Sequence, residues 1–502
     1  MPTDHAIRDL IDDYELTPEF APEGRAMFSP LAADALSSQE MGEYIEASIL
    51  NAITAGTVGL PWWVPRFSDT LKVIAALVDA VNKYNSLHEK VFGEVEFSMP
   101  SRLSPEELQR VNMTFGDFLE SNDLYAISGF LTFAHAAQGY GYVGSIPALY
   151  GLWWITPELL AGYVQMSFHQ KIEEITRMKT SNPVVKAFVR KVTDTLVGGD
   201  ADAVYRTTTM LPEGYGKLWQ RIYEREKLDV RFGVEDLRID RQLDDADAPV
   251  VVEYTNSSGG AARVEFDFLV YTAAHAHAQK YVGDLTSSEA AIFDTLESYV
   301  LATTLYESDP VAQYSEGADT PIMYNVGKML SGANDGEWYA DRNDPLIFAG
   351  ESRVRGKDRQ LRVAYQFYES PCEHDASLCD ADRSPSASGF PEGNASAVLS
   401  QLGRELEAQG VSNVAPQLQF AWPYFHHFPL ESIAEGTPWD LLEMQGESKT
   451  WWLGASACFE SVHDNVNYNL QVLSEAGLLL GSDREGDGKR SRRLRAEAAG
   501  GR

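Results

Sequence analysis

The residue types best suited to chemistry stand close together between Thr450 and Leu473. The segment from Gly454 to Cys458 differs at one position from the G-x-S-x-G turn that exposes a nucleophilic serine in many hydrolases. Cys458 stands where that turn has its last glycine. In that fold an acid and then a histidine follow the serine, and the only histidine after Ser456 is His463, on the helix that comes next. The pattern therefore argues against a hydrolase at this turn.

The same stretch predicts a strand, a turn of small residues and a helix. Trp451 to Leu453 favour a strand, and Ser461 followed by Asp464 is a capping pair in front of an apolar face that begins at Val466. A helix N-terminus offers free N–H groups and a partial positive charge to an anionic ligand. The turn can therefore hold a cofactor, although an ordinary strand-to-helix corner of an α/β core has the same pattern.

One literal match to the dinucleotide fingerprint G-x-G-x-x-G occurs, at Gly139, Gly141 and Gly144. The fingerprint requires a strand before it, a helix opening within it and an acidic residue at the end of the next strand. Pro147 stands where that helix should continue, and no second strand ends in an acid. We expect an aromatic-rich turn near the substrate rather than a phosphate loop.

Two pairs of histidines could ligate a metal. His275 and His277 alternate on a predicted strand, and His426 and His427 are adjacent. A metal site needs a third ligand at a suitable spacing, and the sequence shows none for either pair. We therefore expect ordinary polar side chains and no metal.

Composition narrows the classes of partner. With 41 Lys and Arg against 74 Asp and Glu, the net charge of −33 repels phosphate backbones, so nucleic acid is not an expected partner. The N-terminal residues do not form a signal peptide, and the longest uncharged run, 47–65, is broken by glycines and a proline. We expect a soluble protein with no membrane span. Cys372 and Cys379 could pair in an oxidising compartment, which would leave Cys458 free.

The predicted elements divide the chain of 502 residues into six parts, namely 1–95, 96–200, 201–287, 288–440, 441–480 and 481–502. The first two are helical. The third holds a helix, a hairpin of Val234 to Asp240 with Val250 to Asn256, and a strand from Val264 to Ala273. The fourth mixes helices and strands, the fifth contains the stretch described above, and the last is a disordered tail. This order predicts an α/β (α+β) fold.

Several of these segments also occur in a familiar order. They are the turn and helix from Leu211, the segment Leu228 to Ile239, the segment Phe266 to Ala274, and Thr450 to Leu473. Together they resemble the flavin-dependent amine oxidase superfamily, and Thr114 to Leu119 with Gly139 to Tyr150 resemble its branch of polyunsaturated fatty acid isomerases. The resemblance covers most of residues 100 to 475.

The resemblance implies an FAD-linked oxidoreductase fold. Residues 201–287 and 441–480 would bind FAD, and 96–200 with 288–440 would form a mixed substrate domain. Members of this superfamily begin with a strand, a G-x-G-x-x-G turn and a ribose-binding acid, and nothing before residue 95 supplies them. We therefore expect an incomplete nucleotide-binding domain, in either a shortened family member or an incomplete gene model.

The resemblance also implies which residues meet the cofactor. They are Val234 at the adenine, Thr272 and Ala273 near the flavin, Gly454 and Ala455 at the pyrophosphate and ribityl chain, and Ser461 and Val462 at the flavin pyrimidine edge. The family usually has an acid where this chain has Ala455.

Aromatic residues near the C-terminal end could line a channel for a small apolar or amphipathic substrate, namely Trp422, Tyr424, Trp451 and Trp452. As core residues they would need no such role. The expected function is the FAD-dependent removal of a hydride from a substrate C–H bond, by an oxidase or an isomerase. A non-catalytic binding protein and a metal-dependent or hydrolytic enzyme are the alternatives. The sequence names no catalytic acid or base, substrate, compartment or oligomeric state.

Overall fold

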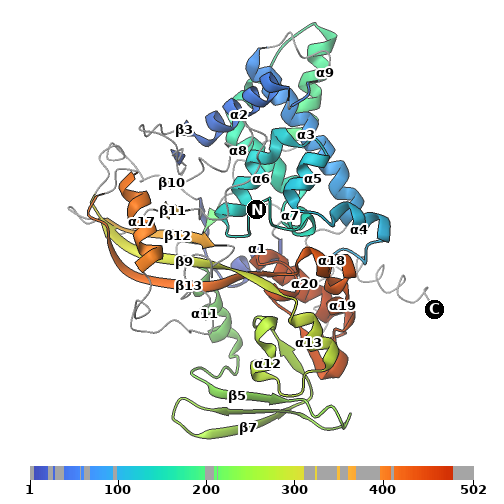
Figure 1. Ribbon diagram of the computed structural model, residues 1–502, viewed down its shortest axis with the longest axis vertical. Coiled ribbons are helices and arrows are strands. Elements are labelled where there is room, and N and C mark those ends of the chain that lie inside the picture. The colour runs from blue at the N-terminus through green and yellow to red at the C-terminus, as the bar shows by residue number, and fades with distance from the viewer. Residues whose placement is uncertain are drawn as a thin grey trace.

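The structure, a computed structural model, has three parts, with helices at the top, a long sheet across the middle and a small sheet at the bottom (Figure 1). It describes residues 5–20, 27–28, 39–56, 58–60, 68–93, 99–197, 209–211, 213–309, 323–324, 347–350, 360–368, 396–408 and 412–478. Cys372, Cys379 and the predicted tail lie outside these residues. Among the described residues, no helix has both the length and the apolar character needed to cross a membrane.

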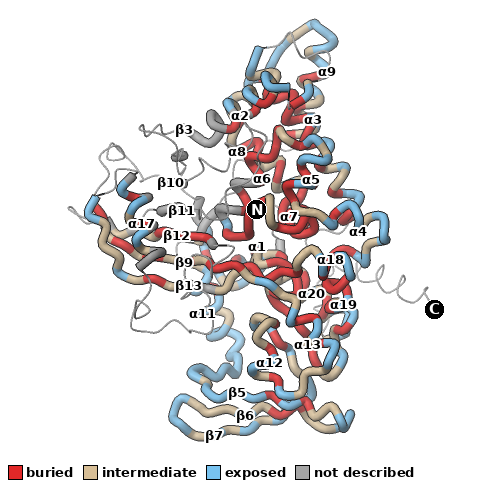
Figure 2. Tube along the Cα trace, in the orientation of Figure 1, coloured by how far each residue is buried: buried red, intermediate tan, exposed pale blue. Residues whose placement is uncertain are grey.

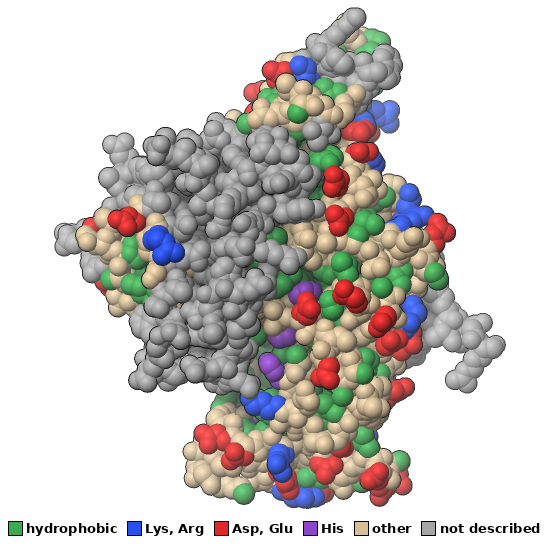
Figure 3. Space-filling view, viewed as in Figure 1, with side chains coloured by type: hydrophobic (Ala, Val, Ile, Leu, Met, Phe, Trp, Pro, Cys, Tyr) green, Lys and Arg blue, Asp and Glu red, His purple; other side chains and the backbone are tan. Residues whose placement is uncertain are grey.

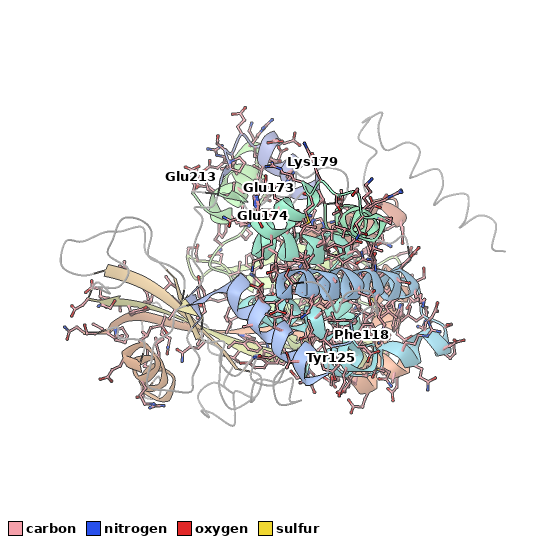
Figure 4. The ribbon with its side chains drawn as sticks, turned by 90° about the horizontal axis from the view of Figure 1, so that it is seen from above. Phe118, Tyr125, Glu173, Glu174, Lys179 and Glu213 are labelled. Carbon is pink, nitrogen blue, oxygen red and sulfur yellow. The ribbon has the colours of Figure 1, made fainter. Side chains whose placement is uncertain are left out.

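The upper part is built around one buried helix, α3 (Asp69–Phe92), which packs against α6 and α8. The helices around it are α2 (Met41–Ala55), α4 (Pro105–Val111), α5 (Phe115–Ser121), α6 (Tyr125–Ala137), α7 (Ala148–Trp154), α8 (Pro157–Thr176), α9 (Pro183–Val192) and the π-helix η1 (Thr193–Val197). Seen from above, Phe118 and Tyr125 lie on one side of this part and Glu173 and Glu174 on the other (Figure 4). The sequence predicted α3 from the helical spacing of Leu71, Ile74, Val78 and Val81, and it predicted α4 and α5 from their start signals.

The middle part is a sheet whose described strands have the order β13-β9-β12-β11-β10-β2-β3. They are β2 (Met27–Phe28), β3 (Gln39–Glu40), β9 (Glu297–Ser308), β10 (Met323–Tyr324), β11 (Ile347–Gly350), β12 (Gln360–Tyr368) and β13 (Ala415–His427), with α17 (Ser396–Ala408) against β12. The pairing of β13 with β9 shifts register between Tyr424 and His427, where Phe425 has a φ of 51°. A bulge of this kind redirects the side chains and N–H groups beside it.

The lower part contains the predicted hairpin. Its elements are α11 (Tyr215–Glu226), β5 (Glu235–Asp240), β6 (Val250–Thr255), β7 (Ala261–Phe266), β8 (Leu269–Tyr271), η2 (His275–His277), α12 (Ala278–Tyr281) and α13 (Ser287–Phe293). β5, β6 and β7 form an antiparallel sheet, which is mostly exposed or intermediate in Figure 2.

Two predictions in this region were wrong. The single strand expected from Val264 to Ala273 is divided into β7, which pairs with β6, and β8, which pairs in parallel with β14. His275 and His277 lie on a short 3-10 helix and not on a strand. The reason is the partner strand: β14 ends opposite Tyr271, so the chain beyond that residue has no ladder to continue.

The C-terminal segment joins the three parts. It consists of α18 (Leu430–Glu435), α19 (Thr437–Glu443), η4 (Glu447–Lys449), β14 (Thr450–Trp452), η5 (Ala455–Ala457) and α20 (Val462–Glu475). One continuous hydrophobic core includes residues of α3, α6, α7, β13, β14 and α20. A smaller core joins α20 to α11 and to α1 (His5–Asp13), beside the short pair of β1 (Glu19–Phe20) and β4 (Thr209–Met210). The strand, turn and helix predicted at this end are all present.

Candidate functional site

The turn after β14 packs directly against the end of β8. Gly454 has a φ of 93°, and a Cβ atom on it would lie 2.6 Å from the carbonyl oxygen of Thr272. Only glycine allows both this backbone conformation and this close approach. Two of the segments predicted to meet the cofactor, Thr272 with Ala273 and Gly454 with Ala455, are therefore in contact, although about 180 residues of chain separate them.

Hydrogen bonds hold this corner together. Leu453 N–H donates to the carbonyl oxygen of Tyr271 at 2.9 Å, and His275 N–H donates to Ser456 Oγ at 3.3 Å. The His275 ring is itself held 3.0 Å from the carbonyl oxygen of Leu453, so it is not placed as a base for Ser456. Burial raises the pKa of the Cys458 thiol well above its ordinary value, which keeps the thiol protonated. The geometry does not favour a hydrolytic nucleophile here.

A buried ion pair fixes β14 to the lower part of the molecule. The Arg241 guanidinium is fully buried and donates to both carboxylate oxygens of Glu289, at 2.6 and 2.7 Å, and to Thr450 Oγ1 at 3.1 Å. It also donates to Asp284 at 3.1 Å. Trp452 Nε1–H donates to Glu289 at 3.2 Å. The corner is thus placed by a network in which both oxygens of the buried carboxylate are paired.

Helix α20 begins as the sequence predicted. Ser461 is its N-cap, and Ser461 Oγ accepts a hydrogen bond from Asp464 N–H at 3.1 Å. Val462, at the first helical position, is 38% exposed, so this helix end is not packed away.

Val234 lies apart from the other residues predicted to meet the cofactor. It immediately precedes β5, whereas Arg241 at the opposite end of that strand contacts Thr450. A strand rises by about 3.3 Å per residue, so roughly 20 Å separates Val234 from this contact. Its role at an adenine stays a prediction.

An aromatic cluster lies beside this corner, made of Tyr140, Trp154, Tyr424, Phe425 and Phe459. The rings of Tyr140 and Tyr424 are nearly parallel, with centroids 6.1 Å apart. The rings of Trp154 and Phe459 each meet Tyr140 edge-on at 4.9 Å. Tyr424, one of the predicted substrate residues, thus belongs to a group drawn from β13, the turn between η5 and α20, and the helical part.

The loop with the dinucleotide-like sequence contributes to this cluster. It follows a helix, α6, and not a strand, so it lacks the context of a dinucleotide fingerprint. Its glycines have packing roles: a Cβ on Gly139 would lie 3.1 Å from the Tyr424 ring, and one on Gly141 would lie 2.9 Å from the Tyr299 ring. The sequence prediction of an aromatic turn here agrees with this geometry.

The three predicted tryptophans are placed differently. Trp452 is fully buried under Arg241, whose guanidinium lies 5.7 Å from its ring. Trp451 is half-buried and meets the ring of Phe268 at 5.2 Å. Trp422 lies on β13, and its side chain is outside the described part of the structure. Substrate roles for these residues stay predictions.

One histidine of each predicted pair lies close to a histidine of the other pair. The rings of His277 and His426 lie 6.5 Å apart, and Figure 3 shows histidine side chains on the middle of one face of the molecule. Burial, together with His277 and His427, lowers the pKa of His426 to about 4, so its ring is neutral at physiological pH. Within the described residues, no group of three or more His, Cys, Asp or Glu is arranged to hold a metal ion.

Sequence reasoning missed Glu460, the residue between Phe459 and the N-cap of α20. Its Oε2 atom is buried and has no hydrogen-bond partner in the described part of the chain. Burial raises the pKa of this carboxyl to about 7, although the backbone amides of Phe425 and His426 oppose the shift. Burial raises the pKa values of Tyr140 and Tyr424, and the charge of Glu460 raises them further. A lone acid before a cap carries no signal that could have found it.

The comparisons with known proteins add the following. No family model matches the sequence, and no curated protein does. A solved fatty acid isomerase from P. acnes, described as CLA-producing, is similar over 94% of this chain and 84% of its own, with 14% identity and a TM-score of 0.59. Putrescine oxidase bound to putrescine is similar over 95% of this chain and 86% of its own, with 12% identity and a TM-score of 0.51. These similarities show that the chain shares its fold with a fatty acid isomerase and an amine oxidase, as the resemblance predicted.

Proposed function

We propose that this protein is an FAD-dependent oxidoreductase that removes a hydride from a C–H bond of a small apolar or amphipathic substrate. One observation carries the proposal: the distant segments around Thr272 and Gly454, which the resemblance implies flank the flavin, are in contact beside the aromatic cluster, and α20, which Ser461 caps, follows in the same stretch of chain. The shared fold supports it. An isomerase would return the hydride to another carbon of the same molecule, and an oxidase would pass it to oxygen.

The residues at this corner suit the flavin end of FAD. The open N-terminus of α20 would face the flavin pyrimidine edge, where Val462 N–H can donate. A reduced flavin carries negative charge on that edge, and a helix N-terminus stabilises such a charge by about 0.3–1 kcal/mol. When bound, the flavin supplies the hydride acceptor.

The phosphate end is less complete. Among the described residues, no strand leads through a G-x-G-x-x-G turn into a helix. Such turns hold the pyrophosphate in nucleotide-binding folds. We therefore expect this chain to bind FAD weakly and in less than stoichiometric amounts.

The test is a titration of the purified protein with FAD, followed by flavin absorbance and fluorescence. Bound flavin is then offered putrescine and a fatty acid with two cis double bonds, and anaerobic bleaching, peroxide formation and diene absorbance are recorded. Val462→Pro should lower the flavin reduction potential because it removes the donor, while Pro remains acceptable at the first helical position. Val462→Ala keeps the N–H and should therefore leave the flavin reduction potential unchanged. Absence of any flavin binding at saturating FAD would contradict the proposal.

A second candidate is a non-catalytic binding protein. It is favoured by an exposed aromatic stripe on α11, where Tyr215 and Trp219 are 45% and 44% exposed, next to Phe232, which is 70% exposed. Large apolar side chains gathered on a surface mark interaction sites. The FAD titration separates the two candidates, because this one predicts no flavin binding and no substrate-dependent chemistry.

A further inference from the structure

The Glu460 carboxylate is held in place by the bulge in β13. Phe425 has a φ of 51°, which is rare for a bulky residue and marks local strain. At this bulge the successive backbone amides of Phe425 and His426 act on the Glu460 carboxylate. The strained bulge therefore positions one carboxylate oxygen and leaves Oε2 without a partner in the described part of the structure.

Titratable groups surround this carboxylate from several elements. Tyr140 comes from the loop after α6, Tyr424 and His426 from β13, Cys458 from the turn after β14, and Asp464 from α20. No ion pair with a Lys or Arg is made by Glu460 in the described structure, unlike Glu289. The tyrosine hydroxyls share a hydrogen bond with each other. Within the described residues Glu460 thus lacks a cation, and its surroundings are neutral tyrosine, thiol and imidazole groups together with a second acid, Asp464.

The proposed reaction needs a group of this kind. When a C–H bond breaks and its electron pair leaves as a hydride, the substrate carbon becomes electron-deficient. When the hydride is removed for good, as in an oxidase, an ammonium or alcohol substrate must also release the proton on its N or O atom before that atom can form a double bond to the carbon. A base beside such a substrate therefore has to take one proton for each hydride removed.

We propose that Glu460 is this base: Oε2 takes the proton from the substrate atom next to the carbon that loses the hydride. The X–H bond breaks, the Oε2–H bond forms, and the X–H electron pair becomes the new double bond. Glu460 precedes Ser461 in the chain, so the base lies at the helix end where the flavin is proposed to bind. This inference rests on the proposed function.

The first experiment follows the proton without any cofactor. Infrared spectra of the intact protein are recorded from pH 5 to pH 9 for wild type, Glu460→Gln and a control, Glu431→Gln, which changes an exposed acid on α18. We expect one carboxylic acid band that disappears with a midpoint near the pKa of about 7, in wild type and control only. A wild-type spectrum without this transition would overturn the inference.

The second experiment asks whether Oε2 meets a substrate. Glu460 is coupled to glycine methyl ester with a carbodiimide, and mass spectrometry measures the yield with and without putrescine or the fatty acid. Protection of Glu460 but not Glu431 is expected. In flavin-loaded protein, Glu460→Gln should lower turnover roughly 100-fold or more and remove the rise of rate with pH, while Glu460→Asp should keep part of both. Unchanged turnover and pH profile in Glu460→Gln would contradict the assignment.

The outcomes also separate this inference from the proposed function. If FAD does not bind but Glu460 titrates near neutral pH and is protected by a probe, the acid–base site stands and the hydride reaction fails. If flavin chemistry occurs and Glu460→Gln retains its rate and pH dependence, the function stands and Glu460 is not the base.

Discussion

Two glutamates that lie near the stretch from β14 to α20 have opposite environments. Glu289, on α13, contacts Trp452 of β14, and both of its carboxylate oxygens are bonded to Arg241. Burial raises its pKa, but Arg241 and the backbone of Thr286 outweigh this and hold the pKa below its ordinary value. In the described part of the structure Glu460 has no such cation, and burial raises its pKa to about 7 against the opposing effect of the Phe425 and His426 amides.

The difference indicates which carboxylate is structural and which is suited to chemistry. A paired buried carboxylate stays ionised and cannot exchange a proton near neutral pH, because protonation would break its ion pair. An unpaired one costs folding free energy when ionised but can both give and take a proton there. The contrast can be tested by removing each group in turn.

The largest effect is expected at the paired glutamate. Glu289→Ala leaves the fully buried Arg241 guanidinium without its main counterion, which should lower the free energy of unfolding by about 3–5 kcal/mol. Urea denaturation at neutral pH measures the loss. The double variant Arg241→Met, Glu289→Leu should recover much of it, since an apolar pair needs no counterion. If Glu289→Ala lowered the free energy of unfolding by less than about 1 kcal/mol, the structural role that distinguishes Glu289 from Glu460 would be contradicted.

The next effect is expected at Glu460, where removing the carboxylate should stabilise the fold by an amount that depends on pH. The folded pKa of Glu460, about 7, lies above its unfolded value near 4.5, so folding favours the protonated form. The contribution of protonated Glu460 to the free energy of unfolding is fully present below pH 4.5 and is lost as the pH rises through 7. Glu460→Gln should therefore stabilise the fold by about 2–3 kcal/mol at pH 8.5, and by little at pH 4. Thermal melting across this pH range measures it, with Glu431→Gln as the control.

A smaller effect tests the loop that contributes Tyr140 to the aromatic cluster. Gly141 has a φ of 105°, and a Cβ there would lie 2.9 Å from Tyr299. Gly141→Ala should destabilise by about 1–2 kcal/mol without a selective loss of FAD affinity. Gly162→Ala, on α8 in open space, is the matched control and should be neutral or slightly stabilising. A selective loss of FAD affinity with the fold intact would assign this loop to the cofactor.

The smallest effect concerns the cap behind Glu460. Ser461→Ala removes the acceptor of Asp464 N–H and should cost about 1 kcal/mol, whereas Ser461→Asn should restore most of it. Chemical denaturation of the three proteins measures the difference. Equal stability of the Ala and Asn variants would show that the side chain of residue 461 does not cap α20.

Features fixed by near neighbours in the chain could be predicted from the sequence. Ser461 caps α20 through a residue three positions away, and β5 pairs with β6 across a short acidic loop. The resemblance also anticipated that the segments around Thr272 and Gly454 belong together. The prediction of a strand through His275 was wrong, because a strand extends only as far as its partner and β14 ends opposite Tyr271.

The sequence by itself therefore determined the caps, the hairpin, the turn at Gly454 and the fold class, since these depend on local backbone preferences and on the spacing of apolar residues. Only the tertiary structure decided that Glu289 is paired and Glu460 is not. The partners that set the two carboxylates apart, Arg241 for one and the bulge at Phe425 for the other, lie 48 and 35 positions away. A pKa depends on what surrounds a group in space, and folding alone brings those surroundings together.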